Sequence, residues 1–549
     1  MTATVADALL DQLAAHGVRV CFGIPGVHNL PLWNGAGQQG RPRVVGVRHE
    51  QAAGYAADAL ARATGGVGVA LTTTGPGFVN ALAAFGEAWT SFSPVLLLSS
   101  ETPVRPRRTS GLDDGLLHGM GSQAGMVEVG FGARAVSATT GEEALAALPE
   151  LVAHALATGR PVYLGVPADV LHHPAPDQVP GPIAPSPARP DADAVRLADA
   201  AVRGRRVALW LGARAVPAEA EVLRLAERLG ALVVPAFQAR GMLASYPGTV
   251  QAPAHEPVVA EAIAACDVLL VVGDDLSGMM TRNWRMPVPP SIVAVVDDAG
   301  LSLGDYPLDA KVVGDVRASV LALLESLGEG SAPEVPDAAA LTAAVRADIA
   351  DDERVSDAAR FVSTIESAWP EPGDALVVDM CISGFWAALY THQPRARRVQ
   401  YPVGWGTLGF GFPAALGPAA DGVATLAVVG DGGIVMGLGE LATIAQERLP
   451  VVVLVVSNGG YGMLRFDQQV EGVAERGVDL LEPKWDHLAA AYDFRYERTD
   501  DPGEGLAAAL VRARAALAEG AATLLVLDAD FHPPRTTSPR WNEGPRTSR

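Results

Sequence analysis

Asp431 follows an apolar run and stands between two glycines, in the segment TLAVVGDGG (425–433). The next apolar run, LPVVVLVVSN (449–458), ends in Asn458, 27 positions after Asp431. If the two runs are neighbouring strands, two oxygen-bearing side chains meet at one edge of a sheet. Oxygen ligands suit a hard divalent cation that also bridges to the phosphates of a ligand. The glycines that follow Asn458 leave room for a backbone carbonyl ligand and for amides directed at phosphate.

Asp and Asn at these positions also suit helix caps and turns, and each residue taken alone favours that interpretation. Together, their spacing resembles the diphosphate and magnesium motif of thiamine diphosphate enzymes, in which a GDG is followed at a similar distance by an Asn. The resemblance implies that Asp431, Asn458 and the carbonyl of Gly460 bind Mg²⁺. It departs from the family at Ser457, where a second Asn is usual. Besides Asn458, the implied cofactor contacts are Gly432, Gly433, Gly460, Tyr461, Gly462 and Met463.

If this resemblance holds, an activating glutamate is expected in another domain, and Glu50 is the candidate. It follows an apolar stretch in RVVGVRHEQAAGYAADALARATGG (43–66), and the alanines at 52, 56, 59 and 63 give the following helix a small-residue face that permits close packing. A Glu in a first helical turn is also favoured by the helix dipole alone. The segment HEQAAGYAADALAR resembles the catalytic-glutamate helix of the acetolactate synthase and benzoylformate decarboxylase branch. The resemblance implies that Glu50 is catalytic and contacts the cofactor.

Further segments resemble the pyrimidine-binding domain of this branch, in the same order, at 22–33, 72–89 and 93–100. The resemblance implies that Gln123 lies near the thiazolium ring of the cofactor, as a catalytic residue. His28 is the best histidine candidate for the pocket, because it directly follows the family-like loop FGIPG. The paired histidines of simple pyruvate-decarboxylase-type enzymes are not visible. Structural or surface roles are expected for the other histidines considered, His49, His118 and His255.

The segment PVGWGTLGFGFPAALG (402–417) contains glycines that match the dinucleotide pattern G-x-G-x-x-G. The match is weak, because the segment lacks a clean preceding strand and a suitably placed acidic residue further on. It resembles instead the family segment that bends the cofactor. This implies that the Gly406 carbonyl accepts from the aminopyrimidine amine and that Leu408 lies between the two rings. An ordinary core position for Leu408 is the alternative.

The rest of the chain alternates short Val/Leu/Ile runs with longer Ala-rich helical stretches. Continuous apolar strands between helices predict α/β domains with parallel sheets covered on both faces. Residues 174–190 contain seven prolines and predict a linker, and 327–339 predicts a weaker boundary. We therefore expect three doubly wound parallel-sheet domains. The resemblance implies that the first binds the pyrimidine, that the second is a middle domain, and that the third binds the diphosphate and Mg²⁺. Their expected limits are 1–173, 191–327 and 340–549.

Charge and cysteine content restrict the partners and the compartment. Lys and Arg number 41 against 62 Asp and Glu, a balance of −21, which argues against nucleic acid or an anionic membrane as partner. The first residues read as an amphipathic helix and not as a signal peptide, and no apolar run reaches the ~18 residues of a membrane span. The three cysteines are too far apart for a zinc cluster and odd in number, so a reduced, cytoplasmic location is expected and a disulfide framework is not.

The resemblance covers nearly the whole chain and implies a decarboxylase or carboligase that depends on thiamine diphosphate and Mg²⁺. It would act on a 2-oxo acid through an enamine, and give an aldehyde or, with an aldehyde or second oxo acid as acceptor, an acyloin or acetohydroxy acid. A homodimer or dimer of dimers is implied. Residues 236–284 lack the FAD-contact pattern and the acceptor-binding Arg of acetolactate synthases, so a specialised relative without FAD is expected. A catalytically silent subunit or regulator and a nicotinamide oxidoreductase stay as alternatives.

Overall fold

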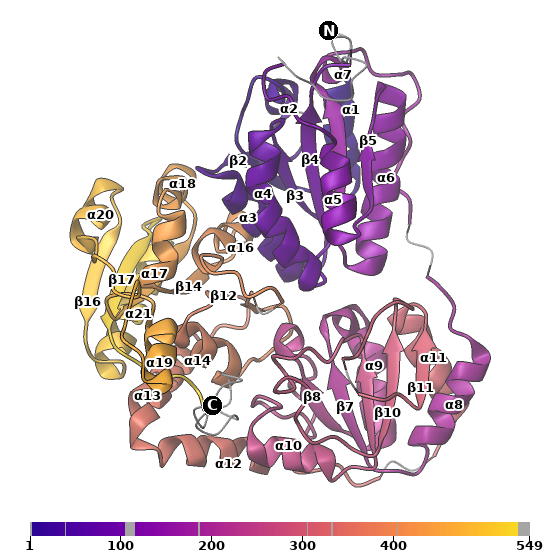
Figure 1. Ribbon diagram of the computed structural model, residues 1–549, viewed down its shortest axis with the longest axis vertical. Coiled ribbons are helices and arrows are strands. Elements are labelled where there is room, and N and C mark those ends of the chain that lie inside the picture. Colours follow the sequence, from indigo (N-terminus) through magenta and orange to yellow (C-terminus); the bar gives the residue numbers. More distant parts are fainter. Residues whose placement is uncertain are drawn as a thin grey trace.

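The computed structural model describes residues 3–38, 40–104, 116–184, 187–304, 306–330, 333–402 and 404–535. Within these residues the named strands form three sheets, and all pairings between them are parallel. Figure 1 shows the three sheets in separate lobes, with the first at the top, the middle one below it and the third to the left. The predicted fold class is confirmed, whereas the exact domain limits stay a prediction.

The first sheet has the strand order β2-β1-β3-β4-β6-β5. Phe22 and Leu97 pack with α3 and α4, whereas Cys21 and Leu96 pack with α1 and α6, so the two faces of the sheet have separate cores. Its elements are α1 (Val5–Ala15), β1 (Val20–Gly23), α2 (Leu30–Gly35), β2 (Arg43–Gly46), α3 (Glu50–Thr64), β3 (Gly68–Thr72), α4 (Pro76–Thr90), β4 (Val95–Glu101), α5 (Gln123–Phe131), β5 (Ala135–Ser137), α6 (Gly141–Thr158), β6 (Val162–Pro167) and α7 (Ala168–Leu171).

The middle sheet has the order β11-β10-β9-β7-β8. Its strands are almost entirely buried, as expected of a parallel sheet covered on both faces. Its elements are α8 (Ala192–Val202), β7 (Val207–Leu211), α9 (Glu219–Leu229), β8 (Leu232–Pro235), α10 (Pro257–Ala264), β9 (Val268–Val272), β10 (Ser291–Val296), β11 (Ala310–Val313) and α11 (Val316–Leu327), with short 3₁₀ turns at Ala213–Ala218 and Phe237–Ala239.

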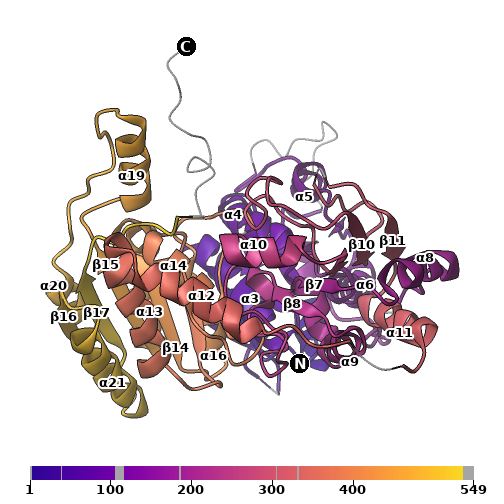
Figure 2. The same ribbon diagram turned by 90° about the horizontal axis from the view of Figure 1, so that it is seen from below.

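The third sheet has the order β13-β12-β14-β15-β17-β16. Its α19 projects away from the rest of the molecule in Figure 2. The elements are α12 (Ala338–Ala350), α13 (Ser356–Ala368), β12 (Ala375–Val378), α14 (Ile382–Tyr390), β13 (Val399–Gln400), α15 (Gly411–Ala414), α16 (Leu416–Ala420), β14 (Thr425–Gly430), α17 (Asp431–Ile434), α18 (Glu440–Glu447), β15 (Val451–Ser457), α19 (Gly462–Glu471), α20 (Trp485–Ala491), β16 (Arg495–Thr499), α21 (Glu504–Ala518) and β17 (Thr523–Asp528), with 3₁₀ turns at Glu353–Val355 and Val435–Gly437.

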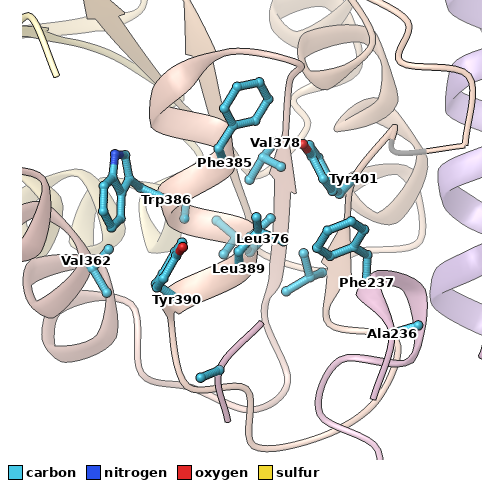
Figure 3. Close-up of a cluster of buried hydrophobic side chains, with 14 of the residues drawn as sticks. Ala236, Phe237, Val362, Leu376, Val378, Phe385, Trp386, Leu389, Tyr390 and Tyr401 are labelled. Atoms are coloured by element: carbon cyan, nitrogen blue, oxygen red, sulfur yellow. The ribbon is translucent and has the colours of Figure 1, made fainter. Parts of the chain in front are cut away.

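The third domain shares a hydrophobic core with each of the other two. Phe410 and Phe412 are fully buried in the same cluster as the alanines of α3. Phe237 of the middle domain packs edge-on against Tyr401, with the ring centroids 5.7 Å apart. Figure 3 shows this pair beside α14, which carries Phe385 and Trp386. These continuous cores fix the third domain against both neighbours.

The carboxyl ends of β14 and β15 lie side by side, as the spacing of the two apolar runs predicts. Gly430 pairs with Val456 in the register of the two strands, which places Asp431 next to Ser457. Among the described residues, no helix is both long enough and apolar enough to span a bilayer. The edge formed by these strand ends is the place to search for a ligand.

Candidate active site

A cavity of about 220 Å³ opens at the carboxyl edge of the third sheet. Among the described residues, every side chain that lines it belongs to the third domain. Apolar side chains such as Ile382, Phe385 and Phe531 form much of its wall. The residues proposed from the sequence that line it are Leu408, Asp431, Gly432, Asn458, Gly460, Tyr461, Gly462 and Met463.

Asp431 is buried at the start of α17, and its carboxylate is held by the loop that follows β15. Gly459 N and Gly460 N donate to its Oδ2 at 2.7 and 3.0 Å, and Gly432 N donates to its Oδ1 at 2.9 Å. Ser457 Oγ donates to Oδ2 at 3.2 Å. Burial raises the pKa of Asp431, and the amide donors partly oppose this shift. Ser457, the departure from the family motif, therefore supports the same carboxylate.

Asn458 presents an amide beside Asp431. Its Nδ2 donates to Asp530 Oδ1 at 2.8 Å, which leaves its carbonyl oxygen to act as a ligand. The described residues contain no metal-type cluster of three or more His, Cys, Asp or Glu side chains. A cation here would thus rely on a mixed set of one carboxylate, one amide oxygen and backbone carbonyls. Such oxygen donors fit Mg²⁺, which keeps several ligand positions for water and phosphate.

The turn from Gly459 to Gly462 packs closely against neighbouring parts of the chain. A Cβ on Gly460 would lie 1.9 Å from Val478 O, and one on Gly462 would lie 2.3 Å from Asn458 Nδ2. Arg465 stabilises the turn, because it donates to Asn458 O at 3.1 Å and to Gly459 O at 3.4 Å. The conformation of this turn therefore depends on glycine and on one arginine that the sequence did not single out.

Leu408 lies half-buried at the cavity wall, in a loop that precedes α15. Gly406 and Gly409 on either side have φ of +72° and +82°, which favours glycine at both positions. Gly406 does not line the cavity itself, and Gly433 lies behind it, where an added Cβ would be 2.3 Å from Asp379 Oδ2 and 3.6 Å from the Leu408 side chain. Gly406 and Gly409 thus set the backbone conformation on either side of Leu408.

Asp379 is a buried site residue that our sequence analysis missed. It directly follows β12, and its carboxylate accepts from Met380 N at 2.8 Å, Gly409 N at 3.0 Å and Phe410 N at 3.2 Å. Burial raises the pKa of Asp379 to about 6, and these amides oppose the shift. It could have been found by the rule that selected Asp431, since it is a carboxylate at a strand end.

Glu50 begins α3 in the first domain, where the ring of His49 caps the helix by accepting from Gln51 N at 3.2 Å. The Glu50 carboxylate is buried and accepts from Asn80 Nδ2 at 3.0 Å. A Cβ on Gly77 would lie 3.2 Å from Glu50 Oε1, so a glycine keeps this side of the carboxylate open. Glu50 is not among the residues that line the cavity.

His28 and His118 meet at the carboxyl edge of the first sheet. Their ring centroids are 5.5 Å apart, and His28 Nδ1 lies 2.9 Å from Thr74 Oγ1. Burial and then the neighbouring His118 lower the pKa of His28. Since 90 positions separate the two histidines, the sequence alone did not indicate the pair.

Gln123 lies under the same edge, and its amide is engaged within the first domain. Its Oε1 accepts from Gly75 N at 2.7 Å, and its Nε2 donates to Tyr163 Oη at 2.7 Å and Ser100 O at 3.2 Å. These contacts hold the turn after β3. A role near the thiazolium stays a prediction. His255, in contrast, is fully buried beside Phe237 in the middle domain, and burial lowers its pKa to about 3.

Comparison with known proteins identifies the family. The N-terminal, central and C-terminal domains of thiamine pyrophosphate enzymes match residues 3–124, 195–324 and 379–526. A probable 2-ketoarginine decarboxylase of Pseudomonas aeruginosa is 33% identical over 530 residues, which cover 92% of this chain and 90% of that protein. The acetolactate synthase large subunit of Mycobacterium tuberculosis is 30% identical, and the match covers 84% of this chain and 77% of that protein. The probable acetolactate synthase large subunit of Methanocaldococcus jannaschii is 28% identical, and the match covers 91% of this chain and 88% of that protein. The chain therefore belongs to the thiamine pyrophosphate enzymes and is a decarboxylase or carboligase of the acetolactate synthase-like type.

Proposed function

We propose that the protein decarboxylates a 2-oxo acid with thiamine diphosphate and Mg²⁺, and that release of the aldehyde is its main outcome. The observation that carries the proposal is the Asp431 carboxylate, fixed by the Gly459 and Gly460 amides at the mouth of a cavity beside Asn458. The decarboxylase from Pseudomonas aeruginosa is more similar to this chain than the two synthases compared above. The missing FAD and acceptor patterns in residues 236–284 agree with this choice.

The third domain would hold the cofactor by its diphosphate. Asp431, the Asn458 amide oxygen and the Gly460 carbonyl would bind Mg²⁺, which offsets the charge of the diphosphate in an otherwise acidic protein. Gly432, Tyr461, Gly462 and Met463 border the cavity and would contact the cofactor there. Gly433 lies behind the cavity wall, so its proposed contact would be indirect. Leu408 and the Gly406 carbonyl would orient its rings.

When bound, thiamine diphosphate would supply a nucleophilic carbon for the carbonyl of the 2-oxo acid, and a thiazolium ring able to take up the electron pair left by carbon dioxide. Glu50 would hold and exchange a proton at the pyrimidine ring nitrogen. His28, with Thr74 as its partner, would move protons at the substrate oxygen. The largely apolar cavity would exclude water from these steps.

A complete site would need two copies of the chain. The cavity is lined by third-domain residues among those described, while Glu50 faces Asn80 in the first domain. We therefore propose a homodimer or dimer of dimers in which the first domain of one copy faces the third domain of another. Large apolar side chains left exposed on these two domains support this, among them Val27 (67%), Val129 (90%) and Leu464 (51%).

The proposal is tested by incubating the purified protein with a panel of 2-oxo acids, with and without an aldehyde acceptor. The panel includes pyruvate, benzoylformate and a 2-oxo acid with a guanidinium group. We expect release of carbon dioxide that requires both thiamine diphosphate and Mg²⁺, with an aldehyde as the main product. A coupled product formed in preference to the aldehyde would favour the second candidate, a carboligase. The absorbance spectrum of the purified protein checks the expectation that FAD is not bound.

A further inference from the structure

The loop that carries Leu408, residues 404–409, rests on the first domain of the same chain. A Cβ on Gly86 would lie 1.9 Å from the ring of Trp405, so the indole packs directly against the backbone of α4. At the end of α4, a Cβ on Gly404 would lie 2.6 Å from Thr90 Oγ1. The 404–409 loop is thus shaped by a surface outside its own domain.

Glu87 of α4 joins the two domains through opposite oxygens of one carboxylate. Glu87 is fully buried. Thr407 Oγ1 donates to Glu87 Oε2 at 2.9 Å, and Trp405 N donates to the same oxygen at 3.3 Å. Ser91 Oγ donates to Glu87 Oε1 at 2.6 Å, within the first domain. One oxygen is therefore directed at the 404–409 loop and the other at α4 itself.

Arg62 of α3 completes the contact and supplies the opposite charge. Its Nη2 donates to Glu87 Oε1 at 3.2 Å, and its Nε donates to Asp58 at 2.7 Å. Its Nη1 donates to Tyr401 O at 2.9 Å, at the start of the segment that leads into the loop. A buried carboxylate that is paired and hydrogen-bonded in this way is held in one geometry.

Asp379 anchors the other side of Leu408. Its carboxylate accepts from Gly409 N at 3.0 Å and Phe410 N at 3.2 Å. Leu408 therefore lies between Thr407, held by a carboxylate of the first domain, and Gly409, held by a carboxylate of its own domain. Two buried anchors on adjacent residues leave the Leu408 backbone little freedom.

We propose that Glu87 is a positioning residue for the reaction, which fixes Leu408 and the Gly406 carbonyl through its hydrogen bond with Thr407. This inference rests on the proposed function, in which those two groups orient the cofactor. A Glu87 that only joined the domains would stabilise the fold without influencing the cofactor. The two roles differ in which hydrogen bond of the carboxylate matters.

Two single substitutions separate these roles, because each removes one hydroxyl group that donates to the Glu87 carboxylate. Thr407→Val removes the bond to the loop, and Ser91→Ala removes a bond within the first domain. In the cofactor-free protein, we expect Thr407→Val to speed hydrogen-deuterium exchange of the backbone amides in residues 404–409, and Ser91→Ala to leave it unchanged. With the cofactor bound, Thr407→Val should lower kcat about tenfold and alter the circular dichroism of the bound cofactor. Ser91→Ala should stay near the wild-type value.

A double substitution tests whether Glu87 acts through Thr407. If it does, Glu87→Gln combined with Thr407→Val should be no slower than the slower single variant. Losses that multiply, or equal effects of Thr407→Val and Ser91→Ala on exchange and kcat, would overturn the positioning role while the wild type remains an active decarboxylase. A wild-type protein that neither binds thiamine diphosphate nor releases carbon dioxide would overturn the proposed function as well.

Discussion

Asp431 carries most of the proposed metal site, because it is the only carboxylate among the proposed Mg²⁺ ligands. We expect Asp431→Ala to weaken Mg²⁺-dependent binding of thiamine diphosphate by more than about 100-fold, since loss of a direct ligand exceeds the 10- to 100-fold typical of supporting residues. Isothermal titration calorimetry with and without Mg²⁺ measures this change.

Ser457→Ala is the matched control for Asp431. It removes the hydroxyl that donates to Asp431 Oδ2 at 3.2 Å but leaves every proposed ligand in place. Its affinity for the cofactor should fall by far less than that of Asp431→Ala. If Asp431→Ala bound thiamine diphosphate as tightly as the wild type, Asp431 would not be a metal ligand. Its carboxylate would then serve only to cap the turn through its hydrogen bonds with backbone amides.

Single residues at strand ends were predictable from the sequence, because an apolar run followed by a polar residue marks the carboxyl edge of a parallel sheet. This rule selected Asp431 and Asn458, and it could have selected Asp379. It could not select Glu87, which contacts Trp405 from 318 positions away and lies in the last turn of a helix. A contact between domains leaves no local sequence pattern from which it could be predicted.

The joint between β12 and the loop before α15 depends on one buried carboxyl, that of Asp379, and its protonation should affect stability. Burial raises its pKa to about 6 from the ordinary 3.8. Between these values the folded chain holds a proton that the unfolded chain has released. The contribution of the protonated form is thus fully present below about pH 4 and is lost as the pH rises through 6, by about 3 kcal/mol.

Asp379→Asn should remove this pH dependence, because the amide keeps an acceptor oxygen for the backbone N–H groups and does not ionise. We expect the free energy of unfolding of the cofactor-free wild type to fall relative to Asp379→Asn between pH 4 and 7. Unfolding in urea at a series of pH values measures the difference. Parallel curves for the two proteins would mean that Asp379 has an ordinary pKa in the folded chain.

Helix α3 illustrates how much of an element the sequence predicts. Its small-residue face predicted close packing, and the structure confirms this, since a Cβ on Gly417 would lie 2.3 Å from Ala56 O and 3.2 Å from Ala59 Cβ. Gly65 ends the helix with φ of +75°. The identity of the partner, α16 of the third domain, was not predictable, because many helices could cover such a face.

At the scale of the whole molecule, the place of Glu50 outside the cavity is the observation behind the proposed assembly. Glu50 begins α3, yet the cavity is lined by third-domain residues among those described. Within the chain, Arg48 N donates to Glu440 Oε1 at 2.9 Å, so the start of α3 lies against α18. If each active site joins the first domain of one copy to the third domain of another, two defects on different domains should complement each other.

Mixing Glu50→Gln chains with Asp431→Ala chains tests this assembly. In a mixed dimer, one site carries both defects and the other carries neither, so two inactive parents should regain about a quarter of the wild-type activity after equal subunit exchange. The control is a mixture of Asp431→Ala with Asn458→Ala, whose defects share one domain, so that no intact site can form. Native mass spectrometry confirms the exchange in both mixtures. If each site were built within one chain, every site in the first mixture would keep one defect, and its activity would stay as low as that of the control.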